Sequence, residues 1–561
     1  MDNQRIILWG LFASLAFVTY TQFQIETQPP AVTEPETVTA PATAAAPADV
    51  TASPSLPPDV GLPAPTATAS ASSQAPLPAA PDTANAAPGA ANIVVETDVL
   101  RIEISRVGGA LVRAELLKYP IDKTNPDNPV VLLNETPLTR YTLDSGLIDT
   151  ERGGPTHEAI LTAPADRYEL SSDSDTLSVP LTWSANGVEV TKTYTFKRGR
   201  YDIDLNYAVI NRSAVDWNAL SYVRISRVHI PPDRSMFDVD SYSFIGPVYY
   251  DTEKYEKLDP EDLADEPLDV TVKGGWIASL QHHFVSAVVP VADRAFRYDA
   301  GFSNGTVVVR ASGTEWRTIS AGAQGNFSAK LFVGPKNQEN LEDTADGLAL
   351  TVDYGILAIL ARPLFWLLQQ VHNFVGNWGW SIIIVTFLIK LAFYKLTEAS
   401  GRSMAKMRKL QPRLKALQER YKDDRQQLSQ QMMELYKREK VNPAAGCLPM
   451  LIQIPFFIAF YWVLLESVEM RQAPFALWIT DLSSKDPYFV LPLLMGAAMF
   501  IQQKLNPAPP DPVQAKVMMF LPVMFTAFFA FFPSGLVLYW LTNSVLSVLQ
   551  QWNINRKMHA D

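Results

Sequence analysis

One positive charge lies inside an apolar segment of this sequence. Lys390 occurs in the run NWGWSIIIVTFLIKLAFYKL, residues 377–396, which has the length and composition of a membrane-spanning helix. A cation costs several kcal/mol in hydrocarbon unless water or polar partners reach it. The position therefore predicts a cation that lines a polar cleft and attracts acidic groups. The alternative is a lysine that extends its ammonium to the interface near Lys395, roughly 7–8 Å away.

Polar side chains in the other apolar segments are candidates for the wall of such a cleft. Thr386 precedes Lys390 by four residues, so the two lie on one helical face. Gln453 stands between two prolines in the next apolar segment. A polar stripe on the last segment comprises Tyr539, Asn543, Ser547 and Gln550. Polar residues within spans face inward or toward water, and the alternative for each is an ordinary interhelical hydrogen bond.

Six apolar segments must position these side chains. Residues 6–23 follow Arg5 and lack a small-x-small cleavage site, so residues 1–26 are predicted to form an uncleaved anchor, with a cleaved signal peptide as the alternative. The second span is 377–396, and residues 447–552 supply spans three to six. Their apolar runs are 448–465, 488–503, 516–532 and 536–552, the last two joined by a Pro-Ser-Gly turn. We therefore expect a multi-pass α-helical membrane protein with six spans, five of which form its core.

Charge is distributed unevenly, and this predicts the topology. Residues 26–355 contain about 45 acidic and about 25 basic side chains, a net charge of roughly −20, whereas the whole chain carries −11. The polar segment 395–442 has about thirteen basic and six acidic residues. Because basic loops stay in the cytoplasm, we expect the acidic domain on the outer side of the membrane, and the basic loop, both termini and the tail 553–561 in the cytoplasm.

Two further segments flank the second span. Residues 354–373 form an apolar helical face interrupted by Arg362-Pro363, which favours a helix lying in the membrane interface over another span. Residues 397–442 predict a short antiparallel helical hairpin with a coiled-coil seam. The seam residues, spaced by three and four, are Met407, Leu410, Leu414, Leu417 and Tyr421, followed by Leu428, Met432 and Leu435.

The region before these helices predicts a linker and an all-β domain. Residues 27–91 are almost entirely Pro, Ala, Thr, Ser and Val, a composition typical of a disordered tether. Residues 92–345 contain alternating or β-branched runs separated by turn residues, and no strand–helix rhythm, so we expect a sandwich of antiparallel sheets. Examples of these runs are 99–105, 188–196, 201–210 and 305–311.

The sequence gives little support to an enzyme, a metal site or a nucleotide site. His282-His283 lies in an apolar run without metal-ligand spacing, and the acidic loop 258–269 lacks the pattern of a calcium loop. The single cysteine, Cys447, excludes an intramolecular disulfide, and no GxxxxGK[ST] motif occurs. The apolar segments show no internal repeat, which argues against a secondary transporter. We therefore predict no catalytic residues, no metal and no cofactor.

Several long motifs resemble the YidC membrane-protein insertase family, in the Gram-negative form with a large periplasmic domain. They are SMAKMRKLQPRLKALQERYKDD from residue 403, the NP-x-x-GC-x-P pattern at Asn442–Pro449, RQAPF-x-LWI-x-DLS at 471–483, and FPSG at 532–535. The resemblance extends from about residue 92 to 552 and is strongest from 377 onward.

The resemblance implies a monomeric insertase and chaperone of the bacterial inner membrane, not an enzyme. It implies a hydrophilic groove, open to the cytoplasm and lipid, with one positive residue that is usually arginine and here is Lys390. Lysine keeps the charge but lacks the planar fork of arginine. The groove residues are then Lys390, Thr386, Gln453, Tyr539, Trp540 and Asn543. The acidic domain resembles a β-supersandwich, similar in fold to sugar-binding enzymes.

The resemblance also implies partners for the insertase. Nascent membrane proteins would enter the groove, either alone or with the Sec translocon, and the hairpin would contact the ribosome or a targeting receptor. The apolar part of a substrate would leave sideways into the bilayer. Adaptable apolar side chains on the fifth span, Met518, Phe520 and Phe525, are expected to form a slide for it.

Overall fold

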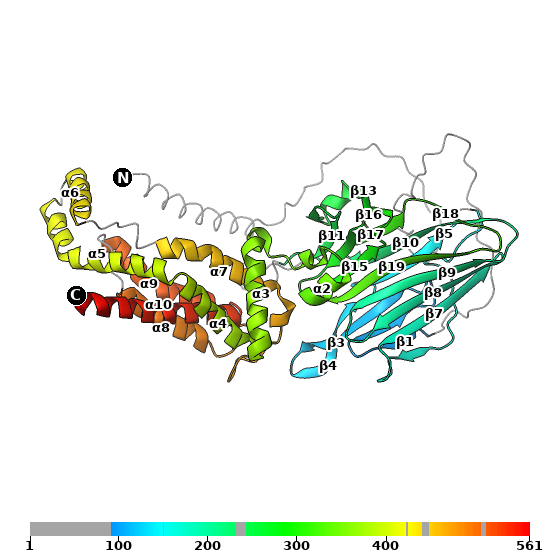
Figure 1. Ribbon diagram of the computed structural model, residues 1–561, viewed down its shortest axis with the longest axis horizontal. Coiled ribbons are helices and arrows are strands. Elements are labelled where there is room, and N and C mark those ends of the chain that lie inside the picture. The colour runs from blue at the N-terminus through cyan, green and yellow to red at the C-terminus, as the bar shows by residue number, and fades with distance from the viewer. Residues whose placement is uncertain are drawn as a thin grey trace, which may run out of the picture. The chain divides into compact units, whose positions relative to one another are not determined.

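The computed structural model describes residues 91–149, 151–231, 243–421, 424–439, 448–505 and 512–560. Figure 1 shows the chain running from strands, in blue to green, into helices, in green to red. The predicted anchor, almost all of the predicted linker, Cys447 and most of the 442–449 motif lie outside the described residues.

Two sheets form the first part of the described chain. One comprises β1 (Ile93–Glu96), β2 (Leu100–Ile104), β3 (Leu111–Asp122), β4 (Asn125–Leu133), β5 (Tyr141–Ile148), β6 (Arg167–Glu169), β10 (Trp217–Val228), β13 (Leu268–Lys273), β16 (Ala295–Ser303), β17 (Thr306–Gly313) and β18 (Arg317–Ile319). Its main path is β13-β16-β17-β10-β5-β3-β2-β1-β6, with β18 on β10 and β4 on β3. Among its described pairs, only β1 and β6 run parallel.

The second sheet has eight strands. They are β7 (Thr176–Ala185), β8 (Val188–Lys197), β9 (Asp202–Asn211), β11 (Gly246–Tyr250), β12 (Tyr255–Lys257), β14 (Trp276–Leu280), β15 (Phe284–Pro290) and β19 (Gln324–Pro335). The order is β12-β11-β14-β15-β19-β9-β8-β7, with antiparallel pairing throughout. The predicted antiparallel sandwich is confirmed, and the four quoted runs correspond to β2, β8, β9 and β17.

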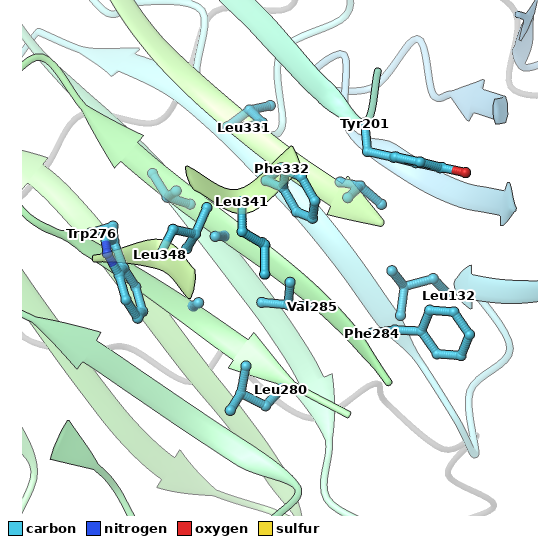
Figure 2. Packing of buried hydrophobic residues seen from close by; sticks show 14 of the residues in the cluster. Leu132, Tyr201, Trp276, Leu280, Phe284, Val285, Leu331, Phe332, Leu341 and Leu348 are labelled. Atoms are coloured by element: carbon cyan, nitrogen blue, oxygen red, sulfur yellow. The ribbon is translucent and has the colours of Figure 1, made fainter. Parts of the chain in front are cut away.

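Burial along the strands shows which faces are covered. In β8, buried and partly exposed side chains alternate strictly, as expected when one face meets the other sheet and one meets solvent. In β14 all five residues are buried, so both faces are covered. Figure 2 shows the second cover, with Leu341 of α2 (Gln338–Thr344) beside Phe332 and Leu348 of η3 (Leu348–Thr351) near Trp276. These short helices at the end of the domain do not appear in the sequence pattern.

The second part of the described chain is helical. It comprises η4 (Gly355–Leu357), α3 (Ala358–Val375), α4 (Trp378–Ala392), α5 (Tyr394–Arg420), α6 (Arg425–Arg438), α7 (Leu448–Glu466), η6 (Val468–Met470), α8 (Val490–Leu505), α9 (Pro512–Phe529) and α10 (Ser534–Ala560). Among the described residues, no single helix combines the length and hydropathy of a membrane span, although α4 and α5 meet that criterion as one bent pair.

The helix around Lys390 ends earlier than the sequence predicts. The Asn377 side chain accepts a hydrogen bond from Trp380 N and so caps the start of α4. The helix then ends at Ala392 and not at 396. At Phe393 the chain leaves helical geometry, and α5 continues at an angle of 67°. Lys390 therefore lies in the last turn of α4, directly before a bend.

The helix predicted over residues 354–373 is present as α3, which runs from Ala358 to Val375. The Arg362-Pro363 pair interrupts the apolar run but not the helix, since Pro363 lies inside α3. The proline lies in the second turn of the helix, where only one main-chain hydrogen bond is lost. Gly376 ends α3 in the left-handed conformation, which glycine adopts without steric cost.

Helices α5 and α6 pack against each other through a small apolar cluster. Its buried members are Leu410, Leu414, Leu435 and Tyr436, with Met407, Leu417 and Met432 partly buried around them. Arg413 donates to Glu439 at 2.7 Å, so the end of the second helix returns to the middle of the first. The predicted seam residues Tyr421 and Leu428 do not belong to this cluster, whereas Tyr436 does.

The strand-rich part contacts the end of α7 through a buried ion pair. Lys336 Nζ lies 3.1 Å from Glu466 Oε2, and the two side chains are only 3% and 5% exposed. Ser243 Oγ donates to Glu466 Oε1 at 3.0 Å. His282 Nε2 lies 3.1 Å from the carbonyl oxygen of Leu465. Three separate loops of the β-domain thus hold the last turn of one helix.

Candidate functional site

A pocket lies where α4, α5, α7 and α10 meet, and Lys390 is in its wall. It encloses about 440 Å³, including its open mouth. Five sequence-predicted site residues line it together: Thr386, Lys390, Gln453, Tyr539 and Asn543. The rest of the lining comprises Ile389, Phe393, Leu396, Thr397 and Phe456. Polar side chains from four helices, α4, α5, α7 and α10, therefore line one pocket together with apolar side chains.

The Lys390 ammonium has two hydrogen-bond acceptors from two different helices. Its Nζ donates to Ser547 Oγ of α10 at 2.8 Å and to Gln453 Oε1 of α7 at 3.4 Å. Within the described part of the chain, no ion pair involves Lys390. The side chain is thus directed into the bundle, and its positive charge is solvated by neutral groups but not neutralised.

Asn543 organises both of these acceptors. Gln453 Nε2 donates to Asn543 Oδ1, so the Gln453 oxygen is left for the lysine. Ser547 Oγ donates to the main-chain oxygen of Asn543 at 2.7 Å, so the serine oxygen likewise serves Lys390 as an acceptor. One turn of α10 thereby orients the Gln453 amide and the Ser547 hydroxyl, both of which present an oxygen to the ammonium.

Two other predicted residues line the pocket without contacting the lysine by a hydrogen bond. Thr386 is 2% exposed, and its hydroxyl donates to Ile382 O of its own helix at 2.6 Å. Tyr539 is buried, and its ring stacks on Phe460 with centroids 4.5 Å apart. Only the Tyr539 contact packs α10 against another helix, α7, whereas the Thr386 bond stays within α4. Both residues shape the wall of the pocket.

Trp540 lies in an aromatic cluster and is not part of the pocket lining. Its ring meets Phe457 edge-on at 4.5 Å and lies 5.2 Å from Phe529 and 6.2 Å from Phe525. Consecutive residues on a helix point about 100° apart, so Trp540 cannot share the face of Tyr539. The structure thus places it against α7 and α9.

The three predicted slide residues differ in exposure along α9. Phe520 is 64% exposed, Met518 is half-buried, and Phe525 packs against Phe529 and Trp540. An apolar exposed face continues along the helix through Val517, Met519, Phe520, Val523, Met524 and Phe528. A face of this kind contacts lipid or another apolar chain.

The position of α10 is fixed at its first turn by the loop between α7 and α8. Ser534 N donates to Ser484 O at 2.7 Å, and Gly535 N donates to Leu482 O at 2.9 Å. Ser534 itself is fully buried. The four-residue motif FPSG thus joins the RQAPF loop in space, which holds Asn543 and Ser547 at their depth.

The remaining candidates in the β-domain do not form a reactive site. The rings of His282 and His283 stack at 3.7 Å. Burial and the nearby charges of His282, Lys336 and Arg471 hold the pKa of His283 well below its usual range. The acidic loop 258–269 is mostly exposed, as predicted, and no cluster of three metal-ligating side chains occurs in the described ranges.

Sequence reasoning missed the ion pair between Lys336 and Glu466. Glu466 follows an apolar run directly, which is a signal for a helix end but names no partner. The partner lies 130 residues earlier, in a loop with no distinctive motif. Only the folded chain brings the two together.

Family models and curated relatives agree on what this chain resembles. Residues 92–367 match the model described as YidC periplasmic domain, and residues 370–561 match that of the 60Kd inner membrane protein. The membrane protein insertase YidC of Nitrosococcus oceani is 46% identical over 575 residues, covering 100% of both chains. That of Thioalkalivibrio sulfidiphilus is 48% identical over 569 residues, covering 100% of this chain and 99% of the relative.

A solved structure described as an active YidC insertase, with its first transmembrane domain resolved, also matches. It is 19% identical, with a TM-score of 0.38, and the match covers 82% of this chain and 92% of that chain. The two curated relatives are named as insertases and not as enzymes.

Proposed function

Because the chain belongs to the YidC membrane protein insertase family, we propose that it inserts newly made proteins into the bacterial inner membrane and helps them fold. The observation that carries the mechanism is the un-neutralised Lys390 ammonium inside a pocket lined by α4, α5, α7 and α10. The pocket is the groove that receives a polar segment of the substrate.

The proposed topology follows the charge distribution. Helices α4, α7, α8, α9 and α10 are the five core spans, and residues 6–23 are a sixth, amino-terminal anchor. The acidic β-domain lies in the periplasm, and α5, α6 and both termini lie in the cytoplasm, because the segment 395–442 is strongly basic. The helix α3 lies in the membrane interface, where its exposed Ile359, Trp366 and Phe374 contact lipid.

The groove lowers the barrier for moving a polar segment across lipid. Desolvation dominates this barrier, and a wet hollow within the bilayer shortens the hydrocarbon path. Lys390 attracts an acidic segment of the substrate into the hollow. The apolar segment leaves along the exposed face of α9, and its burial in lipid, with the membrane potential acting on the acidic segment, drives the reaction.

We propose the same partners as the sequence indicates. Substrates arrive as nascent chains, either directly or from the Sec translocon, and the basic pair α5–α6 contacts the ribosome or a targeting receptor. The protein acts as a monomer and needs no cofactor, because transfer of a segment into lipid requires no covalent step.

The groove can be tested with two substrates that differ in one property. Proteoliposomes carrying the purified protein receive a small single-span protein with either an acidic or a neutral outer tail, and protease protection measures insertion. We expect Lys390→Arg to insert both, Lys390→Ala to be slower with the acidic tail, and Lys390→Glu to be slowest, because like charges repel. Lys395→Glu is the matched control, since Lys395 is exposed and lies outside the pocket lining.

The neutral-tailed substrate is the internal reference for every variant. If Lys390→Glu inserts the acidic-tailed substrate as well as wild type does, attraction by Lys390 is not part of the mechanism. If wild-type proteoliposomes insert neither substrate above protein-free liposomes, the proposed insertase function itself is wrong.

A further inference from the structure

The way in which the Lys390 ammonium is held points to a further residue of the groove. We propose that Ser547 is a positioning residue that keeps the Lys390 ammonium inside the pocket and presents it to an acidic segment of the substrate. This inference rests on the proposed insertase function. Ser547 Oγ lies 2.8 Å from Lys390 Nζ, the shorter of the two hydrogen bonds that the ammonium makes to described residues.

Ser547 acts as an acceptor because its own proton is already used. Its hydroxyl donates to Asn543 O, four residues earlier on α10, at 2.7 Å. A serine that bonds back to its own helix in this way leaves its oxygen lone pairs facing outward. The lysine therefore meets an acceptor whose direction is set by the helix.

The number of donors and acceptors leaves room for a substrate. An ammonium carries three N–H donors, and the described residues supply two acceptors, Ser547 Oγ and Gln453 Oε1. The third donor is available to a carboxylate that enters the pocket. The substrate carboxylate then binds at a fixed position beside the ammonium. It does not have to break either hydrogen bond that Lys390 already makes.

The geometry suits an ammonium better than a guanidinium. The two acceptors come from different helices, one from α7 and one from α10, and each offers a single oxygen. A guanidinium presents its donors in one planar fork, which matches two oxygens side by side. A tetrahedral ammonium instead reaches acceptors in separate directions, and this is the arrangement at Lys390.

Without Ser547 the ammonium has a route out of the pocket. Lys390 lies two residues before the end of α4, and its four-carbon side chain is flexible. A lysine near a helix end extends its charge to water when no inner partner holds it. The charge would then leave the depth at which an acidic segment needs it, so capture of that segment becomes slower.

The test uses Ser547→Ala, with Ser547→Thr to restore the hydroxyl and Ser544→Ala as a matched control on the same helix. Ser544 is buried but does not line the pocket. In proteoliposomes, we expect Ser547→Ala to slow insertion of the acidic-tailed substrate by roughly tenfold to 100-fold, the effect of one hydrogen bond to a charged group. Insertion of the neutral-tailed substrate, and both substrates with Ser547→Thr, should stay within about twofold of wild type.

Two further readouts separate positioning from simple packing. In a Lys390→Ala background, Ser547→Ala should have no additional effect on insertion, because its role acts through the lysine. The full-length protein is reductively methylated and then digested, and mass spectrometry follows the peptide that contains Lys390. Methylation of Lys390 should be faster in Ser547→Ala than in Ser544→Ala, because the released amine reaches water.

The inference is overturned if Ser547→Ala slows both substrates equally, or slows insertion in the Lys390→Ala background by the same factor. It is also overturned if Ser547→Ala matches wild type with the acidic tail while Lys390→Ala does not. In that last case the proposed groove function survives. Failure of wild-type proteoliposomes with both substrates instead contradicts the proposed function.

Discussion

Removing one partner of the ion pair between Lys336 and Glu466 should loosen the contact between the β-domain and α7. Glu466→Gln keeps an oxygen for the Ser243 hydroxyl but leaves the Lys336 ammonium buried without a counter-charge. Lys336→Met removes the charge and retains an unbranched side chain of similar length. The double variant replaces the ion pair by two neutral groups.

The expected loss of stability follows from the distance between the two charged groups and from their burial. At 3.1 Å the attraction between two unit charges is about 5 kcal/mol for an effective dielectric constant of about 20. Desolvation offsets much of this attraction in the intact pair. When one partner is removed the other keeps its desolvation cost, so we expect each single variant to lose about 3–5 kcal/mol. The double variant should recover most of that loss.

Hydrogen exchange measured by mass spectrometry checks this prediction locally. A loss of about 3 kcal/mol corresponds to roughly 150-fold faster exchange, if the amides of 336–344 and 466–470 exchange by local opening. The β1–β2 amides, which belong to the other sheet, serve as the internal control. The reasoning would be refuted if either single variant changed these exchange rates by less than about threefold. It would also be refuted if the double variant accelerated exchange by the product of the two single-variant factors.

Three more outcomes follow from buried contacts. Burial raises the pKa of Glu469 from 4.5 to about 7, so the folded state binds this proton more tightly than the unfolded state. The protonated carboxyl therefore contributes its full stability below about pH 4.5, and this contribution is lost as the pH rises through 7. Glu469→Gln should make the midpoint of thermal unfolding independent of pH over this range. Gly496→Ala places a Cβ 1.9 Å from Thr526 Oγ1, so it should destabilise the α8–α9 contact by about 1–3 kcal/mol, read as a lower midpoint of thermal unfolding. Leu414→Ala removes a side chain that is 4% exposed and should cost the α5–α6 pair about 2–3 kcal/mol, seen as faster proteolysis between residues 410 and 439.

Each of these three outcomes has its own control. Glu466→Gln retains the Glu469 titration, so its pH profile should keep the wild-type slope. Thr526→Ala in the Gly496→Ala background should restore the midpoint, since it removes the clashing hydroxyl; no recovery would place the strain elsewhere. Leu417→Ala, at a partly buried position of the same cluster, should have a smaller effect than Leu414→Ala.

Much of the strand-rich domain and the polar site could be predicted from local sequence. Alternation with period two identified β2, β8, β9 and β17, because each strand buries one face. Helical spacing put Asn543 and Ser547 on one face of α10, and hydropathy marked Lys390 as a charge that needs partners. These properties depend on residues that are close in the sequence, so they can be predicted without the tertiary structure.

Other features depend on residues far apart in the chain. The sequence pattern did not show the bend at Phe393 or the orientation of Trp540 toward Phe457 and Phe529. Local propensity is weak at such points, and packing against other elements decides between conformations of similar energy. The short helices α2 and η3 belong to the same class, because they form by covering an apolar sheet face.

The sequence by itself determined that a cation lies in an apolar helix and that polar residues accompany it in two other helices. The tertiary structure decided which of those residues hold it. Three helices meet so that Ser547 and Gln453 face Lys390, while Thr386 bonds to its own helix and Trp540 turns away. The physical reason is that a buried ammonium must find its acceptors in space, whereas residue types and spacing only state that acceptors exist.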